Sequence, residues 1–368
     1  MRGTRLEVRP AALAANLELA RRQAPDAELV AMLKANGYGH GLLTAARAFA
    51  KADRLGVALL EEASALRAAG IATPLLIAEG CFDVAELEEA ARLGQVACVV
   101  HSPWQVAQLE AAQLTAPVTV WLKLDSGMHR LGMSEAMLRE HLPRLNILPN
   151  VKVTHVMTHL ACADKVDDVL SERQIATCLR LAQAFGLKAS IANSAALLRY
   201  PASLAAAVRP GILLYGSSPF AERSATELGL AVTQRFSARL IAINEVAAGE
   251  SVGYGGRWQA QQPSRIGVVA VGYGDGYPRH APNGTPVAVL TAQGVQRAGL
   301  AGCVSMDMIT IDLTSVPAAR VGDEVELWGD HVSADEVATC AGTISYELFC
   351  QVTARPLRSE ALMLNVEC

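Results

Sequence analysis

The sequence predicts an α/β protein: a (β/α)₈ TIM-like barrel followed by a mainly β C-terminal domain. Its 368 residues are too many for one ordinary hydrophobic core, so two domains are expected. As far as Glu222, short apolar runs alternate with segments of helical periodicity, which favours a parallel sheet covered by helices. Beyond Glu222, β-rich runs are separated by turns of Gly, Pro, Asn and Asp. We place the barrel domain at residues 1–229 and the β domain at residues 230–368.

Eight apolar runs are expected to be the barrel strands. They are Leu29–Lys34, Leu55–Leu59, Pro74–Ala78, Val96–Val100, Val118–Leu124, Val151–His159, Ala189–Asn193 and Ala207–Leu214. Between these runs, apolar residues at helical spacing are clearest at Val84–Leu93 and Glu172–Phe185. The β domain is expected to contain strands at Val232–Ile243, Ile266–Val271, Val287–Leu290, Met308–Leu313 and Glu324–Leu327, and a helix at Ala334–Ala341.

Composition and charge argue against several kinds of partner. The formal net charge of −4 predicts no basic surface for nucleic acid or membrane. No apolar run is long enough to span a bilayer, and residues 1–10 lack the apolar core of a signal peptide. The eight cysteines form no Cys-x-x-Cys pair, which is typical of reduced thiols in a cytoplasmic protein. No metal is expected, because the strand residues between His155 and His159 separate them by about 13 Å.

Several predicted strands end in a chemically active side chain, at the place where a barrel of this kind carries its active site. Lys34 ends the apolar run that begins at Leu29, and glycines and polar residues follow it at once. Burial lowers the pKa of an amine, and a neutral amine attacks carbonyls and forms Schiff bases. The alternative is a lysine whose head group simply reaches solvent where the strand ends.

The residues after Lys34 favour the chemical interpretation. Lys34-Ala35-Asn36-Gly37-Tyr38-Gly39-His40-Gly41 resembles the pyridoxal phosphate (PLP) lysine segment of alanine racemases, except at Gly37, where alanine is usual. The segment from Lys123 to Gly132 resembles the Lys-x-Asp-(Thr/Ser)-Gly-Met-x-Arg-Leu-Gly segment of the same family. Further matching segments are Thr158–Ala161, Ala192–Ala195, Arg209–Ile212, Gly249–Gly255, Gly272–Gly276, Ser305–Asp307 and Ser345–Glu347. Taken singly most are weak, since Asn-Ser and Arg-Pro-Gly are ordinary turn sequences and a lone histidine is usually a core residue.

The resemblance implies a role for each matching residue. Lys34 would hold PLP and act as the base on the D-alanine side, and Tyr254 would be the base on the L-alanine side. Arg130 would contact the phenolic oxygen of PLP and the substrate carboxylate. Lys123, which is often carbamylated in the family, would hold Arg130 in place. His159, also counted among the cofactor-binding residues, would bridge Tyr254 and Arg209, and both would assist Tyr254 as a base.

Arg209 would donate a hydrogen bond to the pyridine nitrogen of PLP. Because arginine keeps its proton, the ring nitrogen would stay unprotonated, which weakens the electron sink and suppresses side reactions. Met306 would contact the substrate carboxylate, and Tyr273 would stand at the entrance of the site. The remaining cofactor-binding residues would be Tyr38, Asn193, Ser194, Gly211, Ile212 and Tyr346, the last four holding the phosphate.

The activity implied by the resemblance is PLP-dependent, two-base interconversion of L-alanine and D-alanine, which supplies D-alanine for peptidoglycan. The family further implies a homodimer whose active sites are shared, and a strand at Arg5–Arg9 that joins the second domain. A broader racemase acting on serine or lysine is the hardest alternative to separate. A PLP-dependent decarboxylase would want an acidic partner for the pyridine nitrogen, which Arg209 argues against. A PLP carrier protein would lack the β domain and Tyr254.

Overall fold

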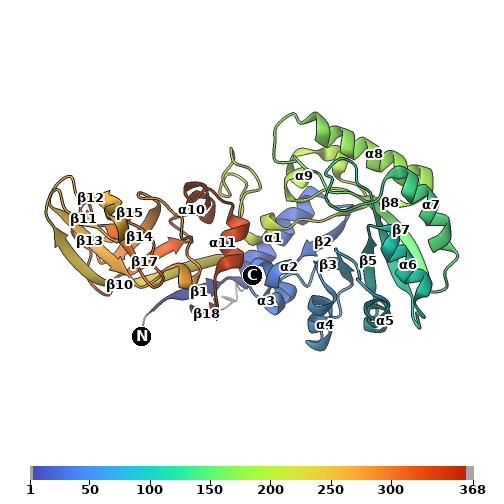
Figure 1. The fold of residues 1–368 in the computed structure, drawn as a ribbon, viewed down its shortest axis with the longest axis horizontal. Coiled ribbons are helices and arrows are strands. Elements are labelled where there is room, and N and C mark those ends of the chain that lie inside the picture. The colour runs from blue at the N-terminus through green and yellow to red at the C-terminus, as the bar shows by residue number, and fades with distance from the viewer. Residues whose placement is uncertain (1–2, 362–368) are drawn as a thin grey trace, which may run out of the picture. The chain divides into compact units, whose positions relative to one another are not determined.

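The computed structural model describes residues 3–361, which form two compact units (Figure 1). The barrel unit consists of residues 13–231, and the β unit combines residues 3–12 with residues 232–361. The chain therefore starts in the β unit, builds the whole barrel and then returns to the β unit. Among residues 3–361, no helix is long and apolar enough to cross a membrane.

Eight parallel strands close into a barrel in sequence order, from β2 to β9, which confirms the predicted fold class. Their bounds are β2 (Glu28–Met32), β3 (Arg54–Val57), β4 (Leu75–Ile77), β5 (Val96–Val100), β6 (Val118–Lys123), β7 (Val151–Met157), β8 (Lys188–Ser190) and β9 (Ala207–Val208). Parallel pairing between β2 and β9 closes the ring. All five residues of β5 are buried, as expected of a strand with side chains inside the barrel and helices outside it.

Helices cover the outside of the barrel (Figure 1). They are α1 (Pro10–Gln23), α3 (Leu42–Ala48), α4 (Leu60–Ala68), α5 (Val84–Leu93), α6 (Pro103–Ala111), α7 (Glu135–Asn146), α8 (Val169–Phe185) and α9 (Ser194–Arg199). The segment labelled α2 (Lys34–Tyr38) follows β2 and has left-handed rather than helical backbone angles at Ala35, Asn36 and Gly37. The bounds predicted for α5 are confirmed. Helix α8 begins three residues before the predicted Glu172, because the Asp168 side chain accepts from the Ser171 N–H and caps the first turn.

The barrel strands lie where the sequence predicts them, but most end earlier. Strand β7 stops at Met157, so His159 lies beyond the strand rather than on it. The expectation of a strand over Ala207–Leu214 is wrong after Val208, because Pro210 has no N–H to continue a ladder. The chain instead forms a 3₁₀ turn, η2 (Ile212–Tyr215).

The β unit is built on an eight-stranded sheet in the order β13-β16-β15-β14-β17-β10-β1-β18. Its strands are β1 (Arg5–Val8), β10 (Gln234–Val246), β13 (Ser264–Val269), β14 (Pro286–Thr291), β15 (Gly294–Leu300), β16 (Ile309–Asp312), β17 (Glu324–Trp328) and β18 (Leu357–Glu360). A two-stranded hairpin, β11 (Ser251–Val252) with β12 (Trp258–Gln259), and the helices α10 (Ala334–Cys340) and α11 (Ser345–Gln351) complete the unit. The five predicted strands are present, whereas β15 escaped prediction because only one of its residues is buried and it lacks an apolar run.

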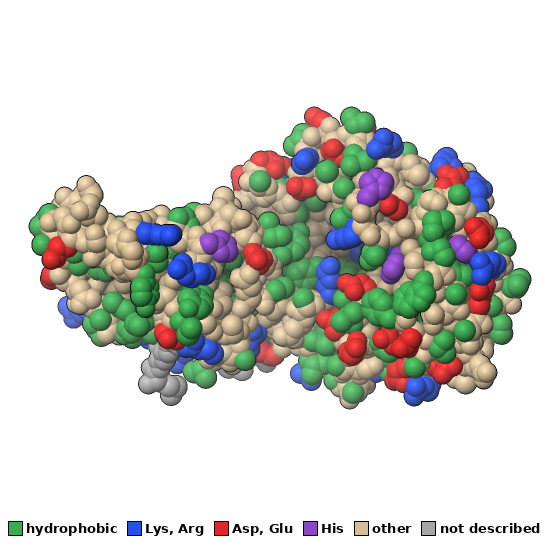
Figure 2. Space-filling view, viewed as in Figure 1, with side chains coloured by type: hydrophobic (Ala, Val, Ile, Leu, Met, Phe, Trp, Pro, Cys, Tyr) green, Lys and Arg blue, Asp and Glu red, His purple; other side chains and the backbone are tan. Residues whose placement is uncertain are grey.

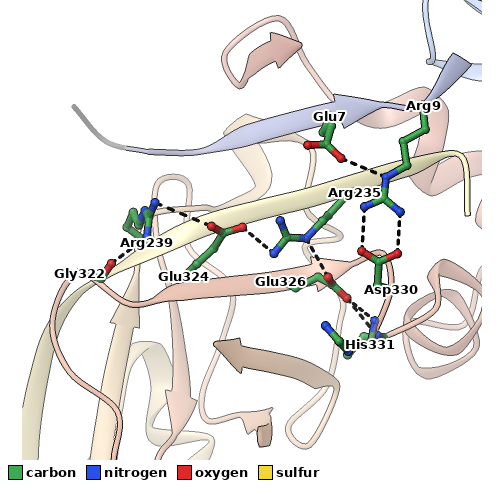
Figure 3. Close-up of polar contacts among 10 residues, drawn as sticks. Glu7, Arg9, Arg235, Arg239, Gly322, Glu324, Glu326, Asp330 and His331 are labelled. Atoms are coloured by element: carbon green, nitrogen blue, oxygen red, sulfur yellow. Dashed lines mark hydrogen bonds and ion pairs between the residues drawn. The ribbon is translucent and has the colours of Figure 1, made fainter. Parts of the chain in front are cut away.

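The first strand is bound into the β unit on both sides. Strand β1 pairs with β10 in antiparallel and with β18 in parallel orientation. Beside it, Arg9 makes a two-pronged ion pair with Asp330, at 2.6 and 2.8 Å (Figure 3). The carboxylate of Glu326, on β17, is fully buried and accepts from Arg235 Nε at 2.9 Å and from the His331 N–H at 2.7 Å. A buried carboxylate that is paired and hydrogen-bonded in this way is tolerated in a protein interior.

Candidate active site

Lys34 stands at the carboxyl end of β2, and an unusual turn follows it. Leu33 is fully buried, whereas Lys34 itself is exposed, so the lysine is not buried as the sequence suggested. The next four residues all have left-handed backbone angles, with φ values of 54° at Ala35, 55° at Asn36, 60° at Gly37 and 48° at Tyr38. Non-glycine residues adopt this conformation at a cost of roughly 1–2 kcal/mol each. The loop predicted here is therefore a strained left-handed turn, and Gly37 relieves the strain at one position.

The turn places Tyr38 against the segment after β9. The Tyr38 ring is buried and stacks on Tyr215 with ring centroids 4.5 Å apart. Tyr215 in turn donates its hydroxyl hydrogen to the Met32 carbonyl at 2.8 Å. A Cβ atom on Gly211 would collide with the Tyr38 hydroxyl, so glycine is required for this close approach. Tyr215 was not anticipated from the sequence, because nothing local distinguishes it from a core tyrosine.

Ser194 is prepared to donate a hydrogen bond. Its Oγ accepts from the N–H groups of Gly211 at 2.9 Å and Leu213 at 3.3 Å. A hydroxyl that accepts twice keeps its own hydrogen for a further acceptor, such as a phosphate oxygen. The neighbouring Asn193 uses its side-chain oxygen to cap α9, accepting from the Ala196 N–H at 3.0 Å. The cap fixes the start of α9 and with it Ser194, whose own hydrogen bonds hold the turn at Gly211.

Arg130 lies on a closed loop between β6 and α7. The Met133 N–H donates to the Lys123 carbonyl at 2.8 Å, and the Asp125 N–H donates to the Met133 carbonyl at 3.0 Å. Inside the loop, the Asp125 carboxylate accepts from the N–H groups of Gly127 and His129. These bonds return the chain to the end of β6, which brings the exposed Arg130 back towards Lys123.

Lys123 is a buried lysine. Burial, together with the positive charges of Arg209, Arg130 and Lys34, lowers its pKa to about 8. A larger fraction of neutral amine is therefore present near neutral pH than for an ordinary lysine. The burial expected of Lys34 is thus found at Lys123 instead.

Arg209 is buried immediately after β9 and is held by main-chain acceptors. Its Nη2 donates to the Thr158 carbonyl at 2.6 Å and to the Ile191 carbonyl at 3.3 Å. Burial lowers the pKa of Arg209 to about 10, which still leaves it protonated at neutral pH. Burial, followed by the charges of Arg209 and Arg130, lowers the pKa of His159 to about 3, so this histidine is neutral.

The carboxyl end of the barrel therefore collects basic groups. Lys34, Lys123, Arg130 and Arg209 all lower the pKa of His159 through their positive charge, which places the five within electrostatic reach of one another. Elsewhere on the barrel unit, acidic side chains gather over α4 and α5 (Figure 2). Concentrated positive charge, a Ser194 hydroxyl that can still donate its hydrogen, and a lysine at the end of a strand fit an anionic, phosphate-bearing aldehyde such as PLP.

The β unit holds the other predicted residues. Tyr254 is 73% exposed on the 3₁₀ turn η3 (Tyr254–Gly256), beside a cavity of about 270 Å³ lined also by Cys303, Ser305 and Met308. Tyr273 is on a second 3₁₀ turn, η4 (Tyr273–Asp275). Its N–H donates to the Ser305 carbonyl at 3.0 Å.

The segment that carries Met306 is fixed to that of Tyr273. The Gly274 N–H donates to the Met306 carbonyl at 2.9 Å. Arg355 reaches both segments, because its Nη2 lies 2.7 Å from Asp307 and its Nε lies 3.4 Å from Asp275. Arg355 was missed by sequence reasoning, since an arginine before a proline carries no local signal. Tyr346 is half-buried on α11.

Comparison with known proteins agrees with this arrangement. Residues 8–219 match the model of the alanine racemase N-terminal domain, and residues 233–359 match that of the alanine racemase C-terminal domain. An alanine racemase of Alcanivorax borkumensis is 58% identical over 360 residues, which covers 98% of this chain and 99% of the relative. A biosynthetic alanine racemase of Pseudomonas aeruginosa is 49% identical over 341 residues, or 92% of this chain and 94% of the relative.

Solved structures give the same result. The crystal structure of the biosynthetic alanine racemase from Pseudomonas aeruginosa has a TM-score of 0.94 at 46% identity, covering 98% of this chain and all of that one. The alanine racemase from Bacillus anthracis, solved with bound L-Ala-P, has a TM-score of 0.84 at 30% identity over 99% and 96% of the two chains. Family models that account for both units, and relatives matched over nearly their whole length, lead to one conclusion: this chain belongs to the alanine racemase family.

Proposed function

We propose that this chain interconverts L-alanine and D-alanine with PLP, that Lys34 holds the cofactor, and that Lys34 and Tyr254 are the two bases. The observation that carries the proposal is the strand-end Lys34 within a cluster of basic groups, in a chain 58% identical to an alanine racemase. Bound PLP would withdraw electrons from the amino acid and so acidify its α-hydrogen. The protein must then move a proton off one face of the α-carbon and return one to the other face.

Residues of both units would orient the cofactor and the substrate. Ser194, Gly211, Ile212 and Tyr346 would hold the phosphate, the Ser194 hydroxyl donating its own hydrogen, and Tyr38 would contact the cofactor. Arg209 would donate to the pyridine nitrogen, and its main-chain partners keep the guanidinium fixed. Arg130 would bind the substrate carboxylate, assisted by Met306. The neutral His159 can accept a hydrogen bond, as required of a residue that assists Tyr254.

Lys123 is proposed to be carbamylated. Its lowered pKa, about 8, favours the neutral amine that attacks CO₂, giving a carbamate and releasing one proton. A carbamate presents two oxygens to the guanidinium fork of Arg130 and offsets positive charge in the cluster. Lys123→Ala should lose most activity, and small carboxylates should restore part of it. A density map showing a bare Lys123 amine in the presence of bicarbonate would contradict this assignment.

The wider role follows from the relatives. A biosynthetic relative suggests that this enzyme, too, supplies D-alanine for peptidoglycan. We place it in the cytoplasm, because the seven cysteines in the described residues are free thiols, as is usual in a reducing compartment. We also propose a homodimer in which Tyr254, Tyr273 and Met306 complete the site of the partner subunit.

The test is to replace Lys34. The wild-type protein, incubated with PLP and reduced with borohydride, should carry a covalent adduct on the peptide containing Lys34. Lys34→Ala should lose that adduct and nearly all racemisation, while Lys51→Ala, which removes an exposed lysine elsewhere on the barrel unit, should retain both. A reducible adduct that persists in Lys34→Ala would overturn the assignment.

The same preparation separates the alternative activities. Products from L-alanine, L-serine and L-lysine are resolved by chiral chromatography, and release of CO₂ is measured in parallel. Racemisation of alanine well above that of the other two supports the proposal. Comparable rates for serine or lysine would make this a broader racemase. Release of CO₂ would contradict the expectation that Arg209 keeps the pyridine nitrogen unprotonated.

A further inference from the structure

Gln174, on α8, is a fully buried polar residue with no assigned role. Its Oε1 accepts from the Ala161 N–H at 3.0 Å. Its Nε2 donates to the His159 carbonyl at 3.1 Å and to Ser126 Oγ at 3.1 Å. One side chain therefore ties together the loop that carries Arg130 and the turn that carries His159.

The hydrogen bonds continue beyond Ser126 in a single direction. Thr158 Oγ1 donates to the Leu124 carbonyl at 3.1 Å, so it has no hydrogen left for Ser126. Ser126 must therefore donate to Thr158 Oγ1, from which it lies 2.6 Å, and it receives from Gln174 Nε2. Chains of this kind, with every member satisfied, polarise one another and hold a unique arrangement.

The chain also reaches Arg209. The carbonyl of Thr158 accepts from Arg209 Nη2 at 2.6 Å, so the residue that receives from Ser126 also anchors the guanidinium. Arg130, His159 and Arg209 follow three different strands, β6, β7 and β9. Main-chain bonds join the chain just past these strand ends, from the Leu124 N–H to the Met157 carbonyl and from the Arg209 N–H to the Ala192 carbonyl, both at 2.8 Å. The hydrogen bonds through Gln174, Ser126 and Thr158 add a side-chain connection among the three segments.

Packing of α8 does not by itself require a glutamine. Apolar residues of the same helix, among them Ile175 and Leu181, are already buried against the barrel unit. A buried amide costs free energy unless all its groups are satisfied, and each bond of Gln174 goes to a segment that bears a proposed site residue. Gly127, on the loop that carries Arg130, also lies against α8. A Cβ atom added to Gly127 would be 3.1 Å from the Leu170 side chain, so this loop and α8 are in close contact.

We propose that Gln174 is a positioning residue: it sets Arg130 and His159 relative to Arg209, and so aligns the substrate carboxylate and PLP with the two bases. This inference rests on the proposed function. Misplacement of about 1 Å in such groups can cost a hundredfold in rate. Loss of the Gln174 amide should therefore lower kcat/KM by more than the loss of protein stability can explain.

The experiment compares Gln174→Met with a matched control, Gln105→Met. Gln105 is also buried, accepts one backbone N–H, from His101, and donates to two acceptors, the carbonyls of Glu79 and Cys81, but none of these bonds goes to the segments of Arg130, His159 or Arg209. Both holoenzymes should lose thermal stability to a similar extent. Only Gln174→Met should lower kcat/KM for L-alanine about tenfold to a hundredfold, raise KM, and weaken PLP binding when the apoprotein is titrated by absorbance.

Two further variants keep the inference testable if Gln174→Met folds poorly. Ser126→Ala should lower kcat/KM in the same way, and the double variant should be little worse than the more damaged single one, since both interrupt one chain. Gln174→Glu keeps the size and the acceptor for the Ala161 N–H. It recovers a donor only when protonated, so its kcat/KM relative to wild type should rise as the pH falls.

The outcomes are distinct. If wild type racemises alanine while Gln174→Met keeps kcat/KM and PLP affinity within twofold, or loses them only in parallel with Gln105→Met, the inference is wrong. A flat ratio of Gln174→Glu to wild-type activity across pH would also contradict it. If wild type itself fails to racemise alanine, the proposed function fails instead.

Discussion

At the scale of single residues, the contact between Tyr38 and Gly211 leads to a sharp prediction. Gly211→Ala places a methyl group into the Tyr38 hydroxyl, and the ring cannot withdraw freely because it is buried and stacked on Tyr215. Overpacking of this kind costs about 1–3 kcal/mol. We expect a lower melting temperature and weaker PLP binding, measured by differential scanning fluorimetry and by absorbance titration.

A second substitution identifies the cause. Tyr38→Phe removes the colliding oxygen, so the variant carrying both changes should recover most of the stability that Gly211→Ala loses. If the two losses simply add, the damage at Gly211 does not arise from Tyr38.

His155 predicts how stability depends on pH. Its ring is buried and stacks on Trp121, with the ring centroids 4.0 Å apart. Burial, followed by the positive charges of Lys188 and Arg54, lowers its pKa from 6.5 to about 3. The folded state then binds fewer protons than the unfolded state between these values, so stability is lost as the pH falls through that window. The loss per histidine is about 1.4 kcal/mol for each pH unit.

Urea unfolding at pH 8, 6.5 and 5 checks the effect. His155→Phe keeps an aromatic ring against Trp121 but cannot titrate. Between pH 6.5 and 5, the free energy of unfolding of this variant should therefore fall by about 2 kcal/mol less than that of wild type. An identical pH dependence in the two proteins would show that His155 does not contribute.

At the scale of the elements, the joining of β10 and β17 depends on a buried charge. Glu326 is fully buried, and removing it leaves the Arg235 Nε and the N–H groups of His331 and Val332 without their acceptor (Figure 3). Breaking a buried pair by deleting one partner costs about 3–5 kcal/mol. Glu326→Leu should therefore destabilise the protein by several kcal/mol, measured by urea unfolding.

The ion pair between Arg9 and Asp330 is the natural comparison. It has ideal two-pronged geometry, but both side chains are partly exposed. Exposed pairs contribute about 0–1 kcal/mol. Asp330→Asn should thus have a small effect, and a loss as large as that of Glu326→Leu would mean that burial is not the deciding factor.

At the scale of the whole molecule, the two proposed bases lie on different units of the chain. In a head-to-tail C₂ dimer, Tyr254 of one subunit would serve Lys34 of the other. Lys34→Ala and Tyr254→Phe chains, each inactive alone, should regain activity when co-expressed, because one site of every mixed dimer receives both intact residues. Random pairing makes half the dimers mixed, so activity should reach roughly a quarter of wild type per site.

Differently tagged chains allow the mixed dimers to be purified before assay. If they are as inactive as the parent variants, each subunit supplies its own tyrosine and the shared site is ruled out. A single peak at the monomer mass in light scattering would contradict the dimer itself.

The sequence by itself determined the repeating order of the barrel and the identity of its basic residues. Eight apolar runs separated by helical patterns are local signals with a fixed period, and all eight became strands β2 to β9. The lysine segment at Lys34 and the Arg-Pro-Gly segment at Arg209 were recognisable because a few adjacent residues carry each of them. Such features depend on neighbours along the chain, which a sequence displays directly.

Only the tertiary structure decided which lysine is buried, how the chain turns after Lys34, and what holds the strand-end loops. Lys123 is buried because other strands surround it, whereas Lys34 is exposed. Gln174 contacts Ser126, and Arg355 contacts Asp307, and in each pair the two residues are 48 positions apart in the sequence. Neither contact produces a recognisable sequence pattern, because a hydrogen bond between distant residues depends on where folding brings two side chains, and not on their spacing in the chain.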